Sequence, residues 1–228
     1  TAELKRSNQE LDQFAYVASH DLKAPLRAIE HLAHWISEDA QALLPPPSQE
    51  HLAKLRGRVK RLDKLLDDLL AYSRAGRTQY HAETLDTRLL LENLIELLNP
   101  PPGFTITIAD EMPTIVTERV PLETLLRNLL SNAIKHHHEP SEGRVHIAAQ
   151  VQGAWATFAV TDNGPGIDPA FHERIFQLFQ TLRPRDQVEG SGIGLAVVKK
   201  TVESYGGTVE IDSNIGQGTT IRFTWPVG

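Results

Sequence analysis

The 228-residue sequence contains no cysteine, which excludes a disulfide framework, a zinc site built on thiolates and a thiol nucleophile. It also lacks a run of about 18 apolar residues and a start of the signal-peptide type, so we expect no membrane segment and no export. The absence of cysteine is compatible with a reducing compartment, and we expect a cytoplasmic location.

Strong positive charge is missing as well. Asp and Glu number 29 against 23 Lys and Arg, the net charge is -6, and no long basic run occurs. Nucleic acid is therefore not an expected partner, although local positive patches could hold phosphates. The chain does have enough apolar residues for a core, 40% of the total, and its length fits about two domains.

Residues 1 to about 40 predict one long helix in which apolar or small residues recur every seven positions. The two lines of this repeat are Leu4, Leu11, Ala18, Pro25, Leu32 and Ala15, Leu22, Ile29, Ile36, a pattern typical of a coiled-coil or bundle seam. His20 lies off both lines, so we expect it to face solvent or a docking partner. Asp21 is a candidate to orient or deprotonate this imidazole, and Lys23 and Arg27 are candidates to hold an incoming anion. A polar surface histidine is the alternative interpretation.

A second helix is expected from a cap at Ser48, after the proline triplet, to about Arg74. Its apolar seam consists of Leu52, Leu55, Val59, Leu62, Leu66 and Leu69. Two amphipathic helices joined by a short loop predict an antiparallel hairpin. Because one hairpin cannot cover both apolar seams, we expect a homodimer in which two chains pair as a four-helix bundle. A monomeric hairpin packed on the rest of the chain is the alternative.

After a linker at residues 75–78 the pattern changes to an alternation of strands and helices. Strands are expected near 80–85, 104–108, 114–117, 144–151, 154–161, 209–212 and 219–225, and helices over 87–98, 122–136 and 193–205. Asp86 is the expected cap of the first of these helices, and a tight turn at Gln152-Gly153 is expected between the two longest strands. The predicted fold class is α+β, with a helical hairpin at residues 1–75 followed by an α/β sandwich at 76–228.

Two amides and an ammonium share one face of the expected helix 122–136. Asn128 and Asn132 are four residues apart, and Lys135 follows three further on. Such a set could bind a magnesium ion and the phosphates that it bridges. Solvated surface asparagines are the alternative.

The segment Asp162-Asn163-Gly164-Pro165-Gly166-Ile167 ends an expected strand with a carboxylate and a tight loop. Asp162 could accept a hydrogen bond from an exocyclic amine, while Gly164 and Gly166 would let a flat ring approach the backbone. An ordinary turn is the alternative.

A second glycine segment, Gly190-Ser191-Gly192-Ile193-Gly194-Leu195, opens a helix, and backbone amides at such a helix start suit a polyphosphate. The polar run before it, residues 180–189, contains Arg183 and Arg185 and could form a lid over a nucleotide; an exposed loop is the alternative. The segment 216–220 is most simply a hairpin turn.

Together and in this order, these segments resemble the sensor histidine kinases of two-component signalling over nearly the whole chain. The stretch from Ser19 to Arg27 is similar to the family's H box, Asn128 to Lys135 to the N box, and Phe176 to Phe179 to the F box. The segments beginning at Asp162, Gly190 and Gly216 are similar to the three glycine boxes. The sequence around Asp21 and over residues 183–190 is similar to that of the phytochrome-like branch.

The resemblance implies a Bergerat-type site for ATP and Mg²⁺ (magnesium). Asp162 would bind the adenine amine, Asn132 and Asn128 would hold the metal, and Lys135 would contact phosphate. The other implied cofactor-binding residues are Gly164, Gly166, Ile167, Arg183, Gly190, Ser191, Gly192, Gly194, Leu195 and Thr219.

The resemblance also implies a reaction and its partners. His20 would accept the γ-phosphoryl group, with Asp21 assisting, and pass it to an aspartate on a response-regulator receiver domain. Since the chain begins inside a helical pattern, we expect a sensor domain upstream of it. A dimeric pseudokinase scaffold that binds ATP without transferring it, and an ATPase of the same superfamily that uses water as acceptor, are the alternatives.

Two positions depart from the family's pattern. Ala24 stands where many relatives have Thr or Asn to position a water for dephosphorylating the partner, so we expect weak phosphatase activity. His136-His137-His138 stands where relatives often carry an aromatic residue and then Thr. Consecutive helix positions point in different directions, which argues against a metal site there.

Overall fold

The computed structural model describes the chain except residues 1, 41–42, 77–79 and 182–190, and residues 2–20 are described without their side chains. The chain divides into two compact units. The helical unit comprises residues 1–74 with 189–191, and the α/β unit comprises 75–188 with 192–228. In the described part of the chain, no helix combines the length and the apolar character that crossing a membrane requires.

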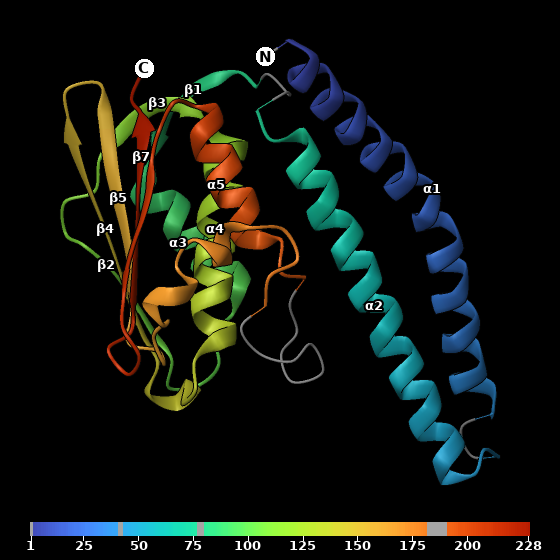
Figure 1. Cartoon of the computed structure of the whole chain (residues 1–228). Helices are drawn as coiled ribbons and strands as arrows, with labels where there is room; N and C mark the ends of the chain where they lie inside the picture. The colour runs from blue at the N-terminus through green and yellow to red at the C-terminus, as the bar shows by residue number, and fades with distance from the viewer. Residues whose placement is uncertain (1, 41–42, 77–79, 182–190) are drawn as a thin grey trace. The chain divides into compact units, whose positions relative to one another are not determined.

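The helical unit is the predicted antiparallel hairpin of α1 (Ala2–Ala40) and α2 (Pro46–Arg74) (Figure 1). The expected cap at Ser48 is wrong, because α2 already begins at Pro46. Proline fits the first turn of a helix, where its missing N–H has no intrahelical acceptor. The N–H groups of Ser48 and Gln49 both donate to the carbonyl of Pro45, at 2.9 and 3.1 Å, which closes this first turn.

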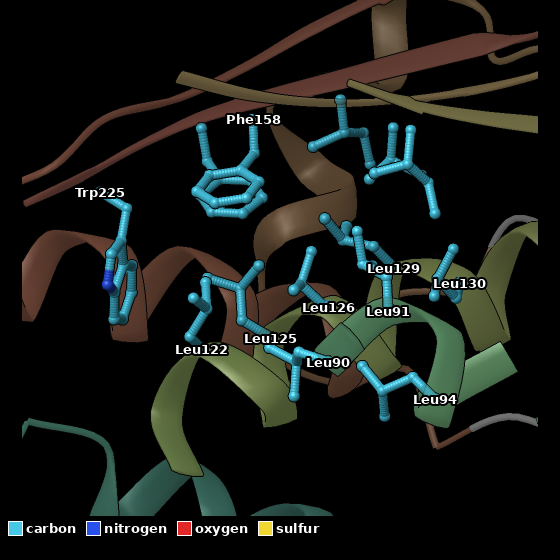
Figure 2. Close-up of a cluster of buried hydrophobic side chains, with 14 of the residues drawn as sticks. Leu90, Leu91, Leu94, Leu122, Leu125, Leu126, Leu129, Leu130, Phe158 and Trp225 are labelled. Carbon is cyan, nitrogen blue, oxygen red and sulfur yellow. The ribbon is translucent and has the colours of Figure 1, made fainter. Parts of the chain in front are cut away.

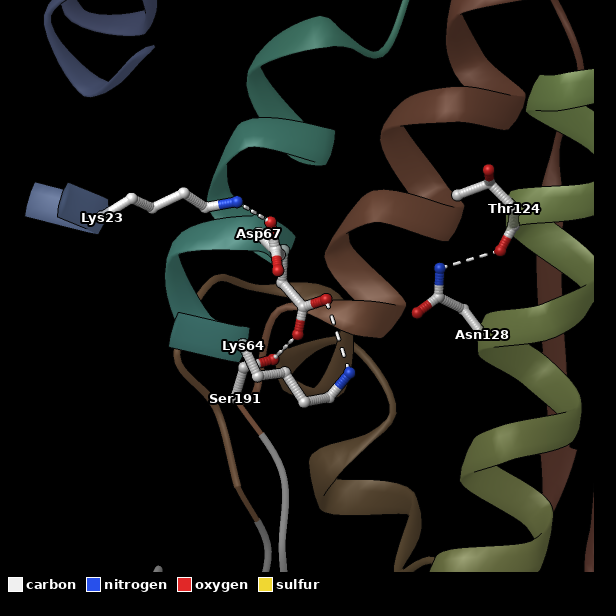
Figure 3. Close-up of polar contacts among 7 residues, drawn as sticks. Lys23, Lys64, Asp67, Thr124, Asn128 and Ser191 are labelled. Atoms are coloured by element: carbon white, nitrogen blue, oxygen red, sulfur yellow. Dashed lines mark hydrogen bonds and ion pairs between the residues drawn. The ribbon is translucent and has the colours of Figure 1, made fainter. Parts of the chain in front are cut away.

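The two helices pack through one apolar line. Ala33 of α1 is buried, as are Val59 and Leu66, which lie seven residues apart on α2. Nearer the other end, the Lys23 ammonium on α1 forms an ion pair with Asp67 on α2 (Figure 3). The structure therefore uses Lys23, a candidate for holding an anion, to join the two helices.

A second apolar line of the hairpin stays exposed within one chain. Its members, between 43% and 56% exposed, are Leu22, Ile29, Leu32, Trp35 and Ile36 on α1 and Leu55 and Leu62 on α2. The predicted α2 seam thus splits, with Val59 and Leu66 facing α1 and Leu55 and Leu62 facing solvent. This confirms that one hairpin cannot cover both seams.

The α/β unit contains a five-stranded mixed sheet with the order β2-β4-β5-β7-β6. The strands are β2 (Thr105–Ile108), β4 (Arg144–Gln152), β5 (Trp155–Asp162), β6 (Val209–Ser213) and β7 (Thr219–Pro226). Only β2 and β4 run parallel. Two further strands, β1 (Ala82–Asp86) and β3 (Thr114–Glu118), form a separate antiparallel pair.

Three helices cover one face of the five-stranded sheet, which makes the unit a two-layer α/β sandwich (Figure 1). They are α3 (Thr87–Leu98), α4 (Arg119–His136) and α5 (Gly194–Ser204), and three single 3₁₀ turns lie at Pro140–Glu142, Pro169–Phe171 and Arg174–Phe176. The predicted cap of α3 is confirmed, since the Asp86 carboxylate accepts the N–H groups of Arg88 and Leu89 at 2.9 and 3.1 Å.

Two predicted boundaries shift. The turn between β4 and β5 is Gly153–Ala154 rather than Gln152-Gly153, because Gln152 still pairs with Trp155 in the ladder. α4 begins at Arg119, so Pro121 lies inside its first turn, where a proline costs no helical hydrogen bond.

The core lies between this helical layer and the sheet. Figure 2 shows leucines of α3 and α4 gathered below Phe158 and to one side of Trp225, which both come from the sheet. These leucines are Leu90, Leu91, Leu94, Leu122, Leu125, Leu126, Leu129 and Leu130. Phe158 stacks on Phe223 with ring centroids 5.1 Å apart. The buried Trp225 indole donates to the Thr117 hydroxyl at 2.7 Å, so its polar atom is satisfied. The core holds α4 and β5, which carry the candidate site, in fixed positions.

Candidate nucleotide-binding site

Asp162 is the last residue of β5, opposite Thr219 at the start of β7. Its Oδ1 accepts the N–H of Gly164 at 2.8 Å. Burial raises the pKa of this carboxyl, while hydrogen bonds from the Gly164 and Thr219 backbones act against that rise. Asp162 is therefore a partly desolvated acceptor held by the loop that follows it, which is the chemistry that an exocyclic amine requires.

The loop after Asp162 packs backbone against backbone on the turn before β7. A Cβ at Gly166 would lie 1.9 Å from the Asn214 carbonyl oxygen, and one at Gly218 would lie 2.0 Å from the Asp162 carbonyl oxygen. Both glycines also have positive φ, +69° and +79°. Gly166 is expected to let a ligand ring approach, and the structure shows that the chain's own backbone already requires a glycine there.

Ser213 joins the same two segments and was not among the candidates from the sequence. Its buried hydroxyl accepts the Ile167 N–H at 2.8 Å and donates to the Gly218 carbonyl at 2.7 Å. The Thr219 hydroxyl lies 2.9 Å from it. The sequence offered no signal, because a serine at a strand end has many possible partners and only the sheet register brings it to Ile167.

The amides of α4 meet the glycine at the start of α5. Asn128 Nδ2 donates to the Thr124 carbonyl at 2.8 Å (Figure 3). A Cβ at Gly194 would lie 3.0 Å from Asn128 Oδ1 and 3.8 Å from Asn132 Nδ2. The structure thus brings Gly194 to Asn128 and Asn132, which lie more than 60 residues before it in the sequence.

The donor set on α4 fits a magnesium ion that arrives with phosphates. Amide oxygens are acceptable ligands for Mg²⁺, which commonly binds to few protein groups and completes its shell with phosphate and water. Among the described residues, no three His, Asp or Glu side chains gather as a dedicated metal site.

The remaining candidates fall in different places. Lys135 is exposed in the last turn of α4, and Leu195 packs partly buried against the core. Gly192 lies against the backbone of Phe179 and Gln180. Ser191 groups with the helical unit, where its hydroxyl donates to Asp68 Oδ2 at 2.6 Å.

Three candidates lie wholly or partly outside the described residues. Arg183 and Gly190 fall in the segment 182–190, and with them the predicted lid. His20 belongs to α1, but its side chain is outside the described part. Asp21 follows it in the same helix and is exposed.

Two family models match the chain. Residues 117–228 match the histidine kinase-, DNA gyrase B- and HSP90-like ATPase domain, and residues 10–78 match the His Kinase A (phospho-acceptor) domain. The α/β unit is thus an ATPase domain of this class. With the phospho-acceptor domain before it, the chain belongs to the sensor histidine kinase family.

Relatives support the same assignment and the predicted likeness to phytochromes. The chain is 37% identical over 99% of its length to cyanobacterial phytochrome A of Nostoc sp. and 34% identical over 99% to the phytochrome-like protein Cph1 of Synechocystis sp., and it covers 30% of each. The crystal structure of full-length ShkA in complex with AMPPNP matches 95% of this chain with a TM-score of 0.74 and 25% identity, and 46% of that chain is covered. The chain spans 30% of the length of each of the two phytochrome relatives. The likeness to the ShkA structure confirms the predicted α+β fold.

Proposed function

We propose that this chain binds ATP with Mg²⁺ in its α/β unit, transfers the γ-phosphoryl group to His20, and then passes it to an aspartate of a response-regulator receiver domain. The observation that carries the proposal is the close approach of Asn128 and Asn132 to Gly194 at the start of α5. The partly desolvated Asp162 carboxylate at the end of β5 completes it. The match of residues 10–78 to a phospho-acceptor domain supports His20 as the acceptor.

The nucleotide-site residues have separate roles in this proposal. Asp162 accepts the adenine amine, Asn128 and Asn132 hold Mg²⁺ through their amide oxygens, and Lys135 contacts phosphate. Phosphoryl transfer needs little covalent chemistry from the protein beyond positioning and neutralisation of charge. The metal would supply much of that neutralisation when bound.

The acceptor step needs an unprotonated imidazole nitrogen on His20. Asp21, the next residue, is proposed to secure it by accepting a hydrogen bond from the other ring nitrogen. A phosphohistidine carries a high-energy group, so a receiver-domain aspartate can take it in a second transfer. We also propose a cytoplasmic location, since the reaction consumes ATP, and a sensor domain upstream, since the relatives are much longer than this chain.

We propose a homodimer through the helical unit. Leu22, Ile29 and Ile36 recur every seven residues on α1 and are 52%, 43% and 50% exposed. Leu55 and Leu62 on α2 repeat with the same spacing and are also exposed. A second copy of the same hairpin would cover both lines as a four-helix bundle, and burial of such large apolar side chains favours association.

The test is incubation of the whole chain with γ-labelled ATP and Mg²⁺. We expect label that is labile in acid and stable in base, as a phosphohistidine is, and we expect none in His20→Gln. His34→Gln is the matched control, since His34 lies exposed on the same helix, and it should be labelled like the native chain. Acid-stable label, or label that survives in His20→Gln, would contradict the proposal. Binding of ATP without any label would instead support the pseudokinase scaffold.

Ala24 leads to a prediction for the reverse reaction. Its methyl group cannot orient a water, so the chain is expected to dephosphorylate a phosphorylated receiver domain weakly or not at all. Ala24 is exposed on α1, and Ala24→Thr should therefore be tolerated and should raise the Mg²⁺-dependent rate. Release of phosphate from a purified phospho-receiver measures both, and a fast rate in the native chain would refute the role of this position.

A further inference from the structure

His137 follows the last residue of α4 and is only 6% exposed. Its neighbours His136 and His138 are both exposed. Its ring meets Phe104 edge-on, with centroids 5.7 Å apart, and stacks on His138 at 5.0 Å. A buried imidazole needs partners for both nitrogens. The partners that it finds point to a role in the nucleotide site.

The hydrogen bonds of His137 determine which nitrogen carries the proton. The backbone N–H of Glu139 can only donate, and it lies 3.1 Å from Nδ1. Nδ1 is therefore the acceptor, and Nε2 carries the hydrogen, which it donates to Asn163 Oδ1 at 3.0 Å. Both nitrogens are used inside the protein, so this histidine has none to give to a metal.

Asn163, the residue next to Asp162, is held from several sides. Its Oδ1 also accepts the Arg144 N–H at 2.6 Å, and its Nδ2 donates to the Glu142 carbonyl at 3.0 Å. Its backbone N–H donates to the Arg144 carbonyl at 3.1 Å. With the bond from His137, both acceptor positions of Oδ1 are filled.

The imidazole also lies against the loop itself. A Cβ at Gly164 would be 3.6 Å from His137 Cδ2 and 2.8 Å from Asp162 Oδ1. His137 thus forms a hydrogen bond with Asn163 and lies next to the open side of Gly164, where a Cβ would stand. A shift of this loop would move the carboxylate, because Gly164 donates to it.

We propose that His137 is a positioning residue for the nucleotide base: by donating to Asn163, it holds the loop that aims the Asp162 carboxylate at the exocyclic amine of adenine. The inference rests on the proposed function, in which Asp162 recognises that amine. His137, which stands where the sequence departs from the family's usual residues, thereby takes part in adenine specificity.

The chain offers a matched pair of substitutions. The side-chain oxygen of asparagine takes the place of Nδ1, so His137→Asn keeps the acceptor for Glu139 but loses the donor to Asn163. The side-chain nitrogen of glutamine takes the place of Nε2, so His137→Gln keeps the donor to Asn163. Both variants lose the ring and its packing. A difference between them therefore reports the hydrogen bond to Asn163 and not the stability of the fold.

The measurement is calorimetric titration of the whole chain with ADP and with IDP, neither of which can be turned over. Inosine carries a carbonyl where adenine carries the amine, so the native chain should bind ADP more tightly. In His137→Asn the affinity for ADP should fall about fivefold, the worth of one net hydrogen bond. The affinity for IDP should stay unchanged, so the preference for ADP falls by the same factor. His137→Gln should keep the native preference.

An unchanged preference for ADP in His137→Asn would overturn the inference, and so would an equal loss in both variants, which would indicate packing alone. A native chain that binds ADP and IDP equally would overturn the proposed role of Asp162 itself. The two failures are therefore distinguishable.

Discussion

Replacement of Asp162 by alanine is expected to weaken ATP binding by on the order of 10- to 100-fold, the range for loss of a hydrogen bond to a charged group. The substitution removes the carboxylate that is proposed to accept the adenine amine, at the end of a strand whose position is set by the core. At ATP concentrations below saturation, the labelling of His20 should fall by a similar factor. Equilibrium titration with ATP and the initial rate of labelling measure the two effects.

Asp168 provides the matched control in the same loop. Its Oδ1 accepts the N–H of Ala170 at 2.9 Å, just as Asp162 accepts the N–H of Gly164 at 2.8 Å. Asp168→Ala therefore loses the same kind of local backbone bond but no proposed ligand contact, and its affinity for ATP should stay within about twofold of native, since surface changes of this kind cost little. Equal losses in the two variants would show that loop stability, and not recognition of the base, explains the effect of Asp162.

Gly218→Ala is expected to destabilise the α/β unit by about 2–5 kcal/mol. Its φ of +79° costs a side chain roughly 1–2 kcal/mol, and forced overpacking costs roughly 1–3 kcal/mol more. The overpacking arises because the new Cβ would lie 2.0 Å from the Asp162 carbonyl oxygen, a backbone atom that cannot rotate away. A loss of this size is a large part of the stability of an ordinary domain. Chemical denaturation followed by near-UV circular dichroism, to which the buried Trp225 contributes, measures it.

Gly216→Ala is the control for the strain alone. Its φ is +78°, almost the same, but a Cβ there would meet nothing within 4 Å. We expect a cost of only about 1–2 kcal/mol. The difference between the two variants isolates the close approach of the β7 turn to Asp162, and two equal costs would refute it.

Local patterns predicted much of this fold because they report local physics. Asp86 was identified as a helix cap because a carboxylate at that position can accept the first free N–H groups, and the helix begins directly after it. The helix predicted over 122–136 carries Leu125, Leu126 and Leu129 at helical spacing, and all three are buried. The predictions that were wrong, the cap at Ser48 and the turn at Gln152-Gly153, are shifts of one to three residues at element ends.

The candidate site was predicted in part. Asn128 and Asn132 could be paired because four residues make one helical turn, and Asp162 stood out because it precedes two closely spaced glycines. The structure adds a reason for Gly166 that the sequence did not predict, the close approach of the Asn214 carbonyl. No local pattern contains a residue 48 positions further along the chain.

By itself, the sequence determined the helices, the strands, the heptad lines and the order of the motifs that indicated the family, because each depends on residues within a few turns of one another. Only the tertiary structure decided that Gly194 lies against Asn128, that Ser213 bonds to Ile167, and that the buried His137 donates to Asn163. These contacts join segments whose encounter depends on sheet register and on helix packing over the whole core. The hydrogen-bonding capacity of a serine or a histidine is visible in the sequence, but its partner is selected by the fold.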